Sequence, residues 1–243
     1  MGSAGTARSP GHAPGTPPMS PVALSFDDGP HPQWTPAVLD ALSAAAIPAT
    51  FFLQGDRLAQ RPDLALAAAA AGHAVQAHCY EHRSHRELSA AEIAADLDRL
   101  LDAMNAVGLP RPRLWRPPYG DIARPRSQEV AASRGLRLVT WTVETCDWAR
   151  DCAATILSEL LAEQRPATRL EPDSIVLMHD SVGAHTAELV GLLADLVRAR
   201  GWTFGPVSPT AQTPERPFNR GPERPFNRGP ERPFNRGRQP TRP

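Results

Sequence analysis

The stretch PVALSFDDGP, residues 21–30, joins an apolar run to an acidic turn. An apolar run that ends abruptly in charge is typical of a strand buried on both faces of a parallel sheet. The Gly-Pro pair predicts a sharp turn directly after it, which keeps both carboxylates out of the core. We therefore predict a buried parallel strand with two acidic side chains at its carboxyl end.

Strand-like and helix-like segments alternate over residues 21–207. Short apolar runs predict strands, and apolar residues at helical spacing predict helices. The predicted strands are 21–26, 49–53, 74–77, 114–115, 136–141 and 174–178, and the predicted helices are 35–46, 61–71, 89–107, 153–163 and 186–200. This alternation predicts an α/β domain whose parallel strands form a closed or nearly closed barrel.

The segments on either side of this domain differ from it in composition. Residues 1–20 are rich in Gly, Pro, Ser and Ala, which predicts a disordered leader. Residues 208–243 contain three copies of PERPFNRG, which begin at Pro214, Pro222 and Pro230. The repeat is too short and too rich in proline for a solenoid. We therefore predict a disordered tail, with a binding array as the alternative.

Composition argues against several classes of protein. The 26 basic and 26 acidic residues give a formal net charge of +0, whereas a nucleic-acid binder needs a basic surplus. The sequence holds no run of about 20 apolar residues, so we predict no contact with a membrane. Its three cysteines do not suggest a disulfide framework, and its amino-terminal residues do not resemble a signal peptide. We therefore expect a cytoplasmic protein.

Reactive side chains follow several predicted strands, where a parallel barrel builds its sites. Asp27 and Asp28 are neighbours that point to opposite sides of a strand, so one can bind a metal while the other handles a proton. His78 and His82 are four residues apart and can share an ion from one side of a helical turn. Two histidines with one aspartate leave coordination positions open, which is the pattern of a catalytic metal site.

Three later segments add polar residues at strand ends. Arg116, in the motif RPPYG, can hold a carboxylate with two hydrogen bonds. ETCDW, residues 144–148, follows the next predicted strand, and His179 follows the apolar run 175–178. Taken singly, each feature has a structural explanation as a turn, a solvated face or a hydrogen-bonded histidine. The functional interpretation depends on their order along the chain.

That order is the one found in the polysaccharide deacetylases of carbohydrate esterase family four, which residues 21–206 resemble. The shared motifs are SFDDGP, HCYEH, RPPYG, ETCDW and LMHD. The resemblance implies a distorted, incompletely closed (β/α)7–8 barrel with its helices outside. It also implies a hydrolase that removes acetyl groups from N-acetylated aminosugars in chitin-like or peptidoglycan-like material. Its cofactor would be one divalent metal ion, with zinc favoured over cobalt, nickel and manganese.

Carried over position by position, the resemblance implies a metal centre with a base beside it. The metal ligands would be Asp28, His78 and His82. Asp27 would be the general base that activates the attacking water, and Arg116 would hold and tune it. A general base must be ionised, and a neighbouring guanidinium favours that state.

The general acid and the substrate contacts would come from other segments. His179 would protonate the leaving amine or alkoxide, with Asp147 orienting or charging its ring. The backbone N–H of Tyr119 would help to stabilise the oxyanion. Trp148 and Leu177 would form apolar walls near the acetyl group.

Three features depart from the family pattern. Cys79 follows the first histidine, where family members usually carry Ser or Thr, and a thiol forms weaker hydrogen bonds. We expect its side chain to point away from the two histidines and to lie outside the ligand set. Glu144 stands where the family typically has Asp, and residues 83–88 form a slightly longer run than usual.

Other functions remain as alternatives. The same machinery could hydrolyse O-acetyl esters of xylan-type substrates, or act as an intracellular small-sugar deacetylase or deformylase. The lack of a recognisable signal peptide favours an intracellular acetylated sugar over a cell-wall polysaccharide. An alternative of another class is a non-catalytic carbohydrate-binding barrel. Such a protein would be expected to have lost Asp27, His78, His82 or His179, and all four are present.

If the repeats are only an extension, deletion of residues 214–243 should leave turnover and the melting temperature unchanged. Both can be measured on the truncated and the full chain side by side. A large loss of either property would instead assign the repeats a structural or binding role.

Overall fold

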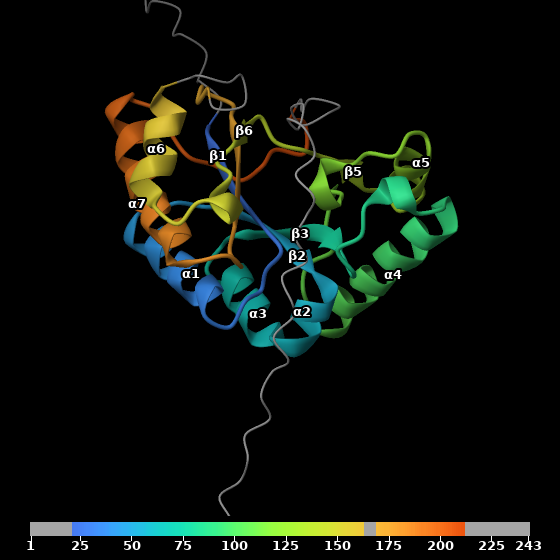
Figure 1. The fold of residues 1–243 in the computed structure, drawn as a ribbon. Helices are drawn as coiled ribbons and strands as arrows, with labels where there is room; N and C mark the ends of the chain where they lie inside the picture. Colours follow the sequence, from blue (N-terminus) through green and yellow to red (C-terminus); the bar gives the residue numbers. More distant parts are fainter. Residues whose placement is uncertain (1–20, 163–168, 212–243) are drawn as a thin grey trace, which may run out of the picture.

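The computed structural model describes residues 21–162 and 169–211 (Figure 1). Seven parallel strands form one sheet in the order β5-β4-β3-β2-β1-β7-β6. The strands are β1 (Ala23–Asp27), β2 (Thr50–Gln54), β3 (Ala74–Cys79), β4 (Leu114–Trp115), β5 (Arg137–Leu138), β6 (Val143–Glu144) and β7 (Ile175–His179). The predicted leader, residues 1–20, and most of the predicted tail, residues 212–243, lie outside the described residues.

The sheet curls into an incompletely closed barrel. β5 and β6 lie at opposite edges of the sheet, yet only residues 139–142 separate them in the chain. This connection can span at most about 18 Å, so the two edges must approach each other. The prediction of an α/β barrel with an open seam is therefore confirmed.

The predicted continuous strand 136–141 is wrong. The chain pairs with β4 at Arg137–Leu138, leaves that edge, and pairs with β7 only at Val143–Glu144. Residues 139–142 bridge the seam, so they have one neighbouring strand at most. The extended, apolar character of this segment reflects its position at the barrel seam.

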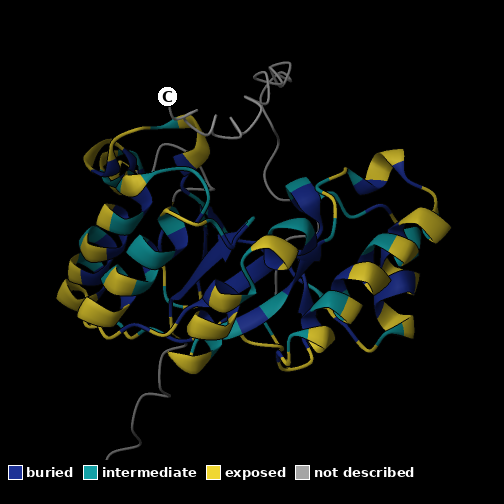
Figure 2. Ribbon diagram, turned by 90° about the horizontal axis from the view of Figure 1, so that it is seen from below, coloured by how far each residue is buried: buried dark blue, intermediate teal, exposed yellow. Residues whose placement is uncertain are grey.

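Helices cover the outer face of the sheet, and their exposed residues lie on the side away from it (Figures 1 and 2). The predicted helix 61–71 is found as α3, which begins one residue later because a proline disfavours helical backbone at the residue before it. Two further helices, α2 and α5, were not predicted. The helices are α1 (Trp34–Ala44), α2 (Gly55–Gln60), α3 (Pro62–Ala70), α4 (Ala90–Ala106), α5 (Arg126–Ser133), α6 (Ala153–Leu161) and α7 (Ala184–Ala199).

Side chains alternate between the two faces of the sheet, as the period of a strand requires. On β1, Leu24 and Phe26 pack in the outer core beneath the helices. A smaller inner cluster lies on the opposite face, and its members are Ala23, Phe52, Leu114, Val139, Trp141, Ile175, Leu177 and Val207. After α7, the chain crosses the amino ends of the strands, where Val207 N donates to Thr50 Oγ1 at 2.9 Å. The polar carboxyl ends of the strands therefore have an apolar floor beneath them.

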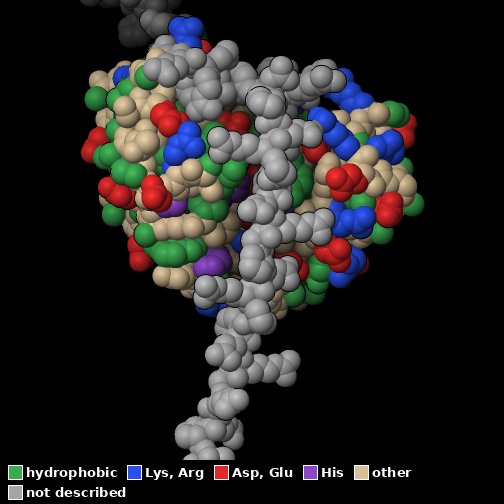
Figure 3. Space-filling view, viewed as in Figure 1, with side chains coloured by type: hydrophobic (Ala, Val, Ile, Leu, Met, Phe, Trp, Pro, Cys, Tyr) green, Lys and Arg blue, Asp and Glu red, His purple; other side chains and the backbone are tan. Residues whose placement is uncertain are grey.

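The outer surface carries charges of both signs. Basic and acidic side chains are interspersed on the face shown in Figure 3, in keeping with the formal net charge of +0. Within the described residues, we find no helix that combines the length and the apolar character needed to cross a membrane.

Adjacent leucines of α6 provide a matched test of the outer core. Leu160 is 3% exposed and Leu161 is 48% exposed. Leu160→Ala should lower the free energy of unfolding by about 2–5 kcal/mol, because it leaves a cavity. Leu161→Ala should lower it by about 0.5 kcal/mol, as a surface substitution does. Urea unfolding followed by circular dichroism measures both, and equal losses would contradict the packing of α6.

Candidate metal and acid–base site

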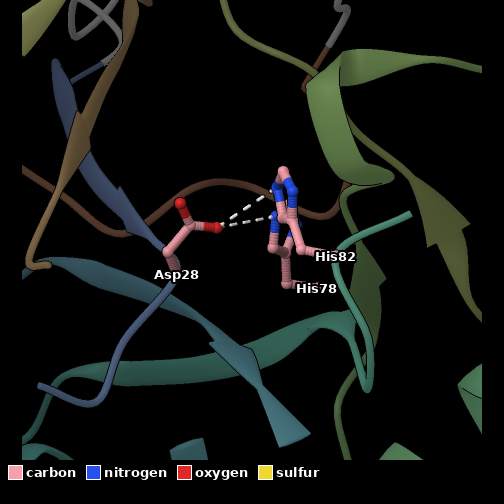
Figure 4. Close-up of side chains that lie close together, drawn as sticks. All are labelled: Asp28, His78 and His82. Atoms are coloured by element: carbon pink, nitrogen blue, oxygen red, sulfur yellow. Dashed lines mark ion pairs between the residues drawn. The ribbon is translucent and has the colours of Figure 1, made fainter. Parts of the chain in front are cut away.

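The first element of the site is the turn that ends β1. Asp28 has a φ of 69°, in the left-handed region, which costs energy for a residue other than glycine. In a continued strand, Asp28 would point away from Asp27. The turn instead directs its carboxylate toward two histidines (Figure 4). Its backbone is held by Arg57, which donates to Asp28 O at 2.8 Å, and by Gln54 N, which donates to Gly29 O at 2.8 Å.

Asp28, His78 and His82 form the group that could hold a metal ion. Asp28 Oδ1 lies 3.2 Å from His78 Nε2 and 3.4 Å from His82 Nε2. The ligand atoms of the three residues all lie within 4.8 Å of one another. The prediction that the two histidines share a helical turn is wrong: His78 is in β3, and His82 is in the loop that follows it. Cys79, between them, is not a member of the group.

The hydrogen bonds of His78 leave a place for a cation. Its Nδ1 lies 2.6 Å from the carbonyl oxygen of Arg116, which can only accept, so Nδ1 carries a proton. In a neutral ring, Nε2 is then an acceptor that faces the carboxylate of Asp28. Both Asp28 Oδ1 and His78 Nε2 are buried without a hydrogen-bond partner among the described residues. Two imidazole nitrogens and a carboxylate oxygen are a donor set that suits a divalent ion such as zinc.

The surroundings shift the pKa values of all three residues. Burial raises the pKa of Asp28, but the contact with His78 and the charges of His82 and His179 outweigh it and hold the pKa well below its usual range. Burial lowers the pKa of His82 to about 4, so this ring is neutral at pH 7. Burial also acts to lower the pKa of His78, yet the charges of Asp27 and Asp28 raise it overall. In the metal-free protein, a proton on His78 can therefore take the place of the cation.

Arg116 supports both Asp27 and the metal group. Its side chain is fully buried, and its Nη1 donates to Asp27 Oδ1 at 2.7 Å and to Ser25 Oγ at 3.0 Å. Its Nη2 donates to Thr140 O at 3.1 Å, and its guanidinium carbon lies 4.0 Å from the ring centroid of Phe52. A guanidinium keeps its charge in proteins. Asp27 is thereby fixed in position beside a permanent positive charge.

His179 and Asp147 form a second buried pair. Asp147 Oδ1 lies 2.7 Å from His179 Nδ1 and accepts from Trp148 N at 3.1 Å. Asp147 Oδ2 accepts from His179 N at 2.7 Å and from Thr186 Oγ1 at 3.0 Å. Burial acts to lower the pKa of His179, but the charge and hydrogen bond of Asp147 raise it to about 10. The imidazole is therefore held in its protonated form, and its Nδ1–H donates to Asp147 Oδ1.

The three residues predicted to contact the substrate differ in their surroundings and exposure. Tyr119 has a φ of 59°, and its ring meets His82 edge-on, with 4.5 Å between the ring centroids. Leu177 precedes His179 by two residues and is buried in the inner cluster. Trp148 is 52% exposed and lies at the surface. The structure thus places the ring of Tyr119 against His82, Leu177 inside the barrel and Trp148 in contact with solvent.

Several contributors to the site were not identified from the sequence. Ser25 could have been found, because it lies two residues before Asp27 and so faces the same side of β1. Thr140 and Thr186 contact Arg116 and Asp147 across 24 and 39 residues of chain. Arg57 contacts Asp28 across 29 residues. These three contacts depend on the tertiary fold and leave no local signal.

The chain is similar in sequence to known carbohydrate deacetylases. The family model described as polysaccharide deacetylase matches residues 15–139. A chitooligosaccharide deacetylase of Bradyrhizobium sp. is 40% identical over 163 residues, which cover 65% of this chain and 70% of the relative. A peptidoglycan-N-acetylglucosamine deacetylase of Bacillus cereus is 31% identical over 176 residues, covering 72% of this chain and 62% of the relative. The match with the latter therefore spans less than two thirds of that protein's length.

Solved structures show the same fold. A family 4 carbohydrate esterase from Streptomyces lividans, in complex with acetate, matches with a TM-score of 0.71 and 32% sequence identity. The match covers 80% of this chain and 98% of the esterase chain.

The charge of Asp147 should control the proton affinity of His179. In the metal-free protein, Asp147→Asn should move the pKa of His179 from about 10 down toward the ordinary 6.5. Nuclear magnetic resonance titration of ring-labelled histidine measures this pKa. The stability contributed by the pair should be complete below about pH 6.5 and be lost as pH rises through about 10, because the folded-state pKa is the higher one.

A matched control is Asp98→Asn, which removes a carboxylate that binds Arg134 at the surface. It should leave the pKa of His179 unchanged. A pKa that stays near 10 in the Asp147→Asn protein would contradict the assignment of Asp147 as its cause.

Proposed function

The chain belongs to the polysaccharide deacetylase family, and we propose that it is a metal-dependent hydrolase that removes acetyl groups from N-acetylated aminosugars. The observation that carries the proposal is the pair of buried acceptors, Asp28 Oδ1 and His78 Nε2, which face each other 3.2 Å apart without a donor among the described residues. Zinc is the ion that best suits the donor set, with cobalt, nickel and manganese as alternatives.

The reaction needs a stronger nucleophile than neutral water and a protonated leaving group. A divalent ion bound by the three residues supplies Lewis-acid chemistry, since it polarises a carbonyl and lowers the pKa of water to about 7. Asp27, fixed by Arg116, would take a proton from the attacking water. His179 would donate a proton from Nε2 to the leaving nitrogen, while its Nδ1–H donates a hydrogen bond to Asp147. The C–N bond breaks, and acetate and a free amine result.

Other residues would bind the substrate around the Asp27–Arg116 and His179–Asp147 pairs. The backbone N–H of Tyr119, next to the metal group, would stabilise the negative charge that develops on the carbonyl oxygen. Leu177 would contribute an apolar wall for the acetyl methyl group from inside the barrel. Trp148, which is half exposed, would contribute a second wall where the sugar enters.

The names of the relatives support an aminosugar substrate. Peptidoglycan-N-acetylglucosamine and chitooligosaccharide are the substrates in the names of the two curated relatives. We propose a substrate of the same chemical class for this chain, namely an oligosaccharide or polysaccharide with N-acetylated amino groups. O-acetylated sugars and small acetylated or formylated sugars are the alternatives, because the same acid and base can act on an ester or a formamide.

Acetate release tests the mechanism. Chitooligosaccharide, peptidoglycan fragments and acetylxylan are each incubated with the protein, with and without a chelator. Acetate should be released from the N-acetylated substrates, release should stop with chelator, and added zinc should restore it. Asp27→Asn should lower turnover at least about 100-fold, because it removes the general base.

The matched control is Asp63→Asn, which removes an exposed carboxylate whose partner is Arg61. Its turnover should equal that of the unmodified protein. Release from acetylxylan alone would favour the O-acetyl alternative. Retention of zinc with no acetate from any substrate would favour a non-catalytic barrel, and full activity in the presence of chelator would refute the metal mechanism.

A further inference from the structure

A second buried carboxylate, that of Asp180, lies directly behind the turn that carries Asp28. Asp180 is 1% exposed, and a Cβ atom added at Gly29 would overlap its carboxylate. Gly29 follows the metal ligand Asp28 directly, so the carboxylate packs against the backbone of the metal-ligand turn. The mechanism proposed above gives Asp180 no role in the chemistry.

The contact follows from the register of the sheet. β1 and β7 are parallel, and Asp27 pairs with His179 at their carboxyl ends. Asp28 and Asp180 are therefore the first residues beyond the paired strands. The carboxylate of Asp180 occupies the space that the missing side chain of Gly29 leaves open.

A hydrogen-bond chain fixes this carboxylate from the other side. Thr35 Oγ1, in α1, donates to Asp180 Oδ2 at 2.5 Å, and the same hydroxyl oxygen accepts from His31 N at 2.7 Å. Thr35 is 1% exposed. The other carboxylate oxygen, Oδ1, has no hydrogen-bond partner among the described residues. A buried carboxylate with one orphaned oxygen is costly, so a positional role would explain its presence.

We propose that Asp180, held by Thr35, is a positioning residue that keeps Asp28 in the conformation needed to bind the metal ion. Asp28 has a φ of 69°, and such a backbone persists only where its surroundings enforce it. Arg57 and Gln54 hold the turn through its carbonyl oxygens, on Asp28 and on Gly29. Asp180 packs against the same turn at Gly29, so without its carboxylate the turn can relax into the vacated space. The inference rests on the metal site of the proposed function.

Zinc affinity tests the proposal without reference to activity. Zinc dissociation constants are measured by competition with a chromophoric chelator, and melting temperatures are recorded alongside. Thr35→Val removes the hydroxyl at nearly constant volume, and Asp180→Ala removes the carboxylate. Each should weaken zinc binding about tenfold or more, the usual loss when a residue that supports a metal ligand is removed. Thr35→Ser retains the hydroxyl and should restore an affinity within about twofold of the unmodified protein.

Thr50→Val is the matched control for the loss of a buried threonine. Thr50 is fully buried, and its hydroxyl accepts from Val207 N at the opposite end of the barrel. This variant should lower the melting temperature and leave zinc affinity unchanged. An equal loss of zinc affinity in Thr50→Val and Thr35→Val would attribute the effect to general destabilisation and overturn the proposal.

Three further results separate the possible failures. Unchanged zinc affinity in both Thr35→Val and Asp180→Ala, with tight binding by the unmodified protein, would refute the role of Asp180 and leave the proposed function intact. Loss in Asp180→Asn without loss in Thr35→Val would show that only the charge of Asp180 acts on the metal, and would also refute the positioning role. An unmodified protein that binds no zinc, cobalt, nickel or manganese would refute the proposed function itself.

Discussion

The site is organised around two acceptor atoms that the fold forces together. Asp28 Oδ1, from the turn after β1, and His78 Nε2, from β3, lie 3.2 Å apart and are both buried. Two buried acceptors at this distance repel each other unless a cation lies between or beside them. A proton on His78 meets this need in the metal-free protein, and a divalent ion meets it with the help of His82. The proposed metal binding would therefore be coupled to the release of a proton.

Arg116 links the metal group to Asp27 and is itself held by surrounding residues. Its carbonyl oxygen fixes the tautomer of His78, and its guanidinium fixes Asp27, so one residue orients a metal ligand and the proposed base. The guanidinium is buried, and it is satisfied in part by Ser25 and by the carbonyl of Thr140 in the barrel seam. The apolar inner cluster lies against it through Phe52. The curl of the sheet is thus required for the chemistry, since it brings the seam within reach of β1 and β4.

Much of the fold was predictable, because burial on both faces of a parallel strand leaves a local signature. Apolar runs such as residues 174–178 identified the strands, and the polar residues directly after them identified the face that carries the site. The seam was not predictable, since residues 136–144 have the pattern of one extended strand and divide only because the two sheet edges meet there. The left-handed backbone of Asp28 was also hidden, because non-glycine residues give no sign of it. The contacts of Thr186 and Asp180 could not be predicted from helical or strand periodicity, because they join elements that are distant in the sequence.

The two acid–base pairs differ in a way that suits opposite tasks. Asp27 is a carboxylate whose Oδ1 accepts a hydrogen bond from the buried guanidinium of Arg116, which fixes it as an acceptor. His179 is an imidazole beside a buried carboxylate, and this environment raises its pKa to about 10 and favours its charged, proton-donating form. The principal partner of Asp27 is Arg116 and that of His179 is Asp147, so the two groups are held by different neighbours. Proton acceptance and proton donation can then occur at the same centre and at the same pH, which is what hydrolysis of an amide demands.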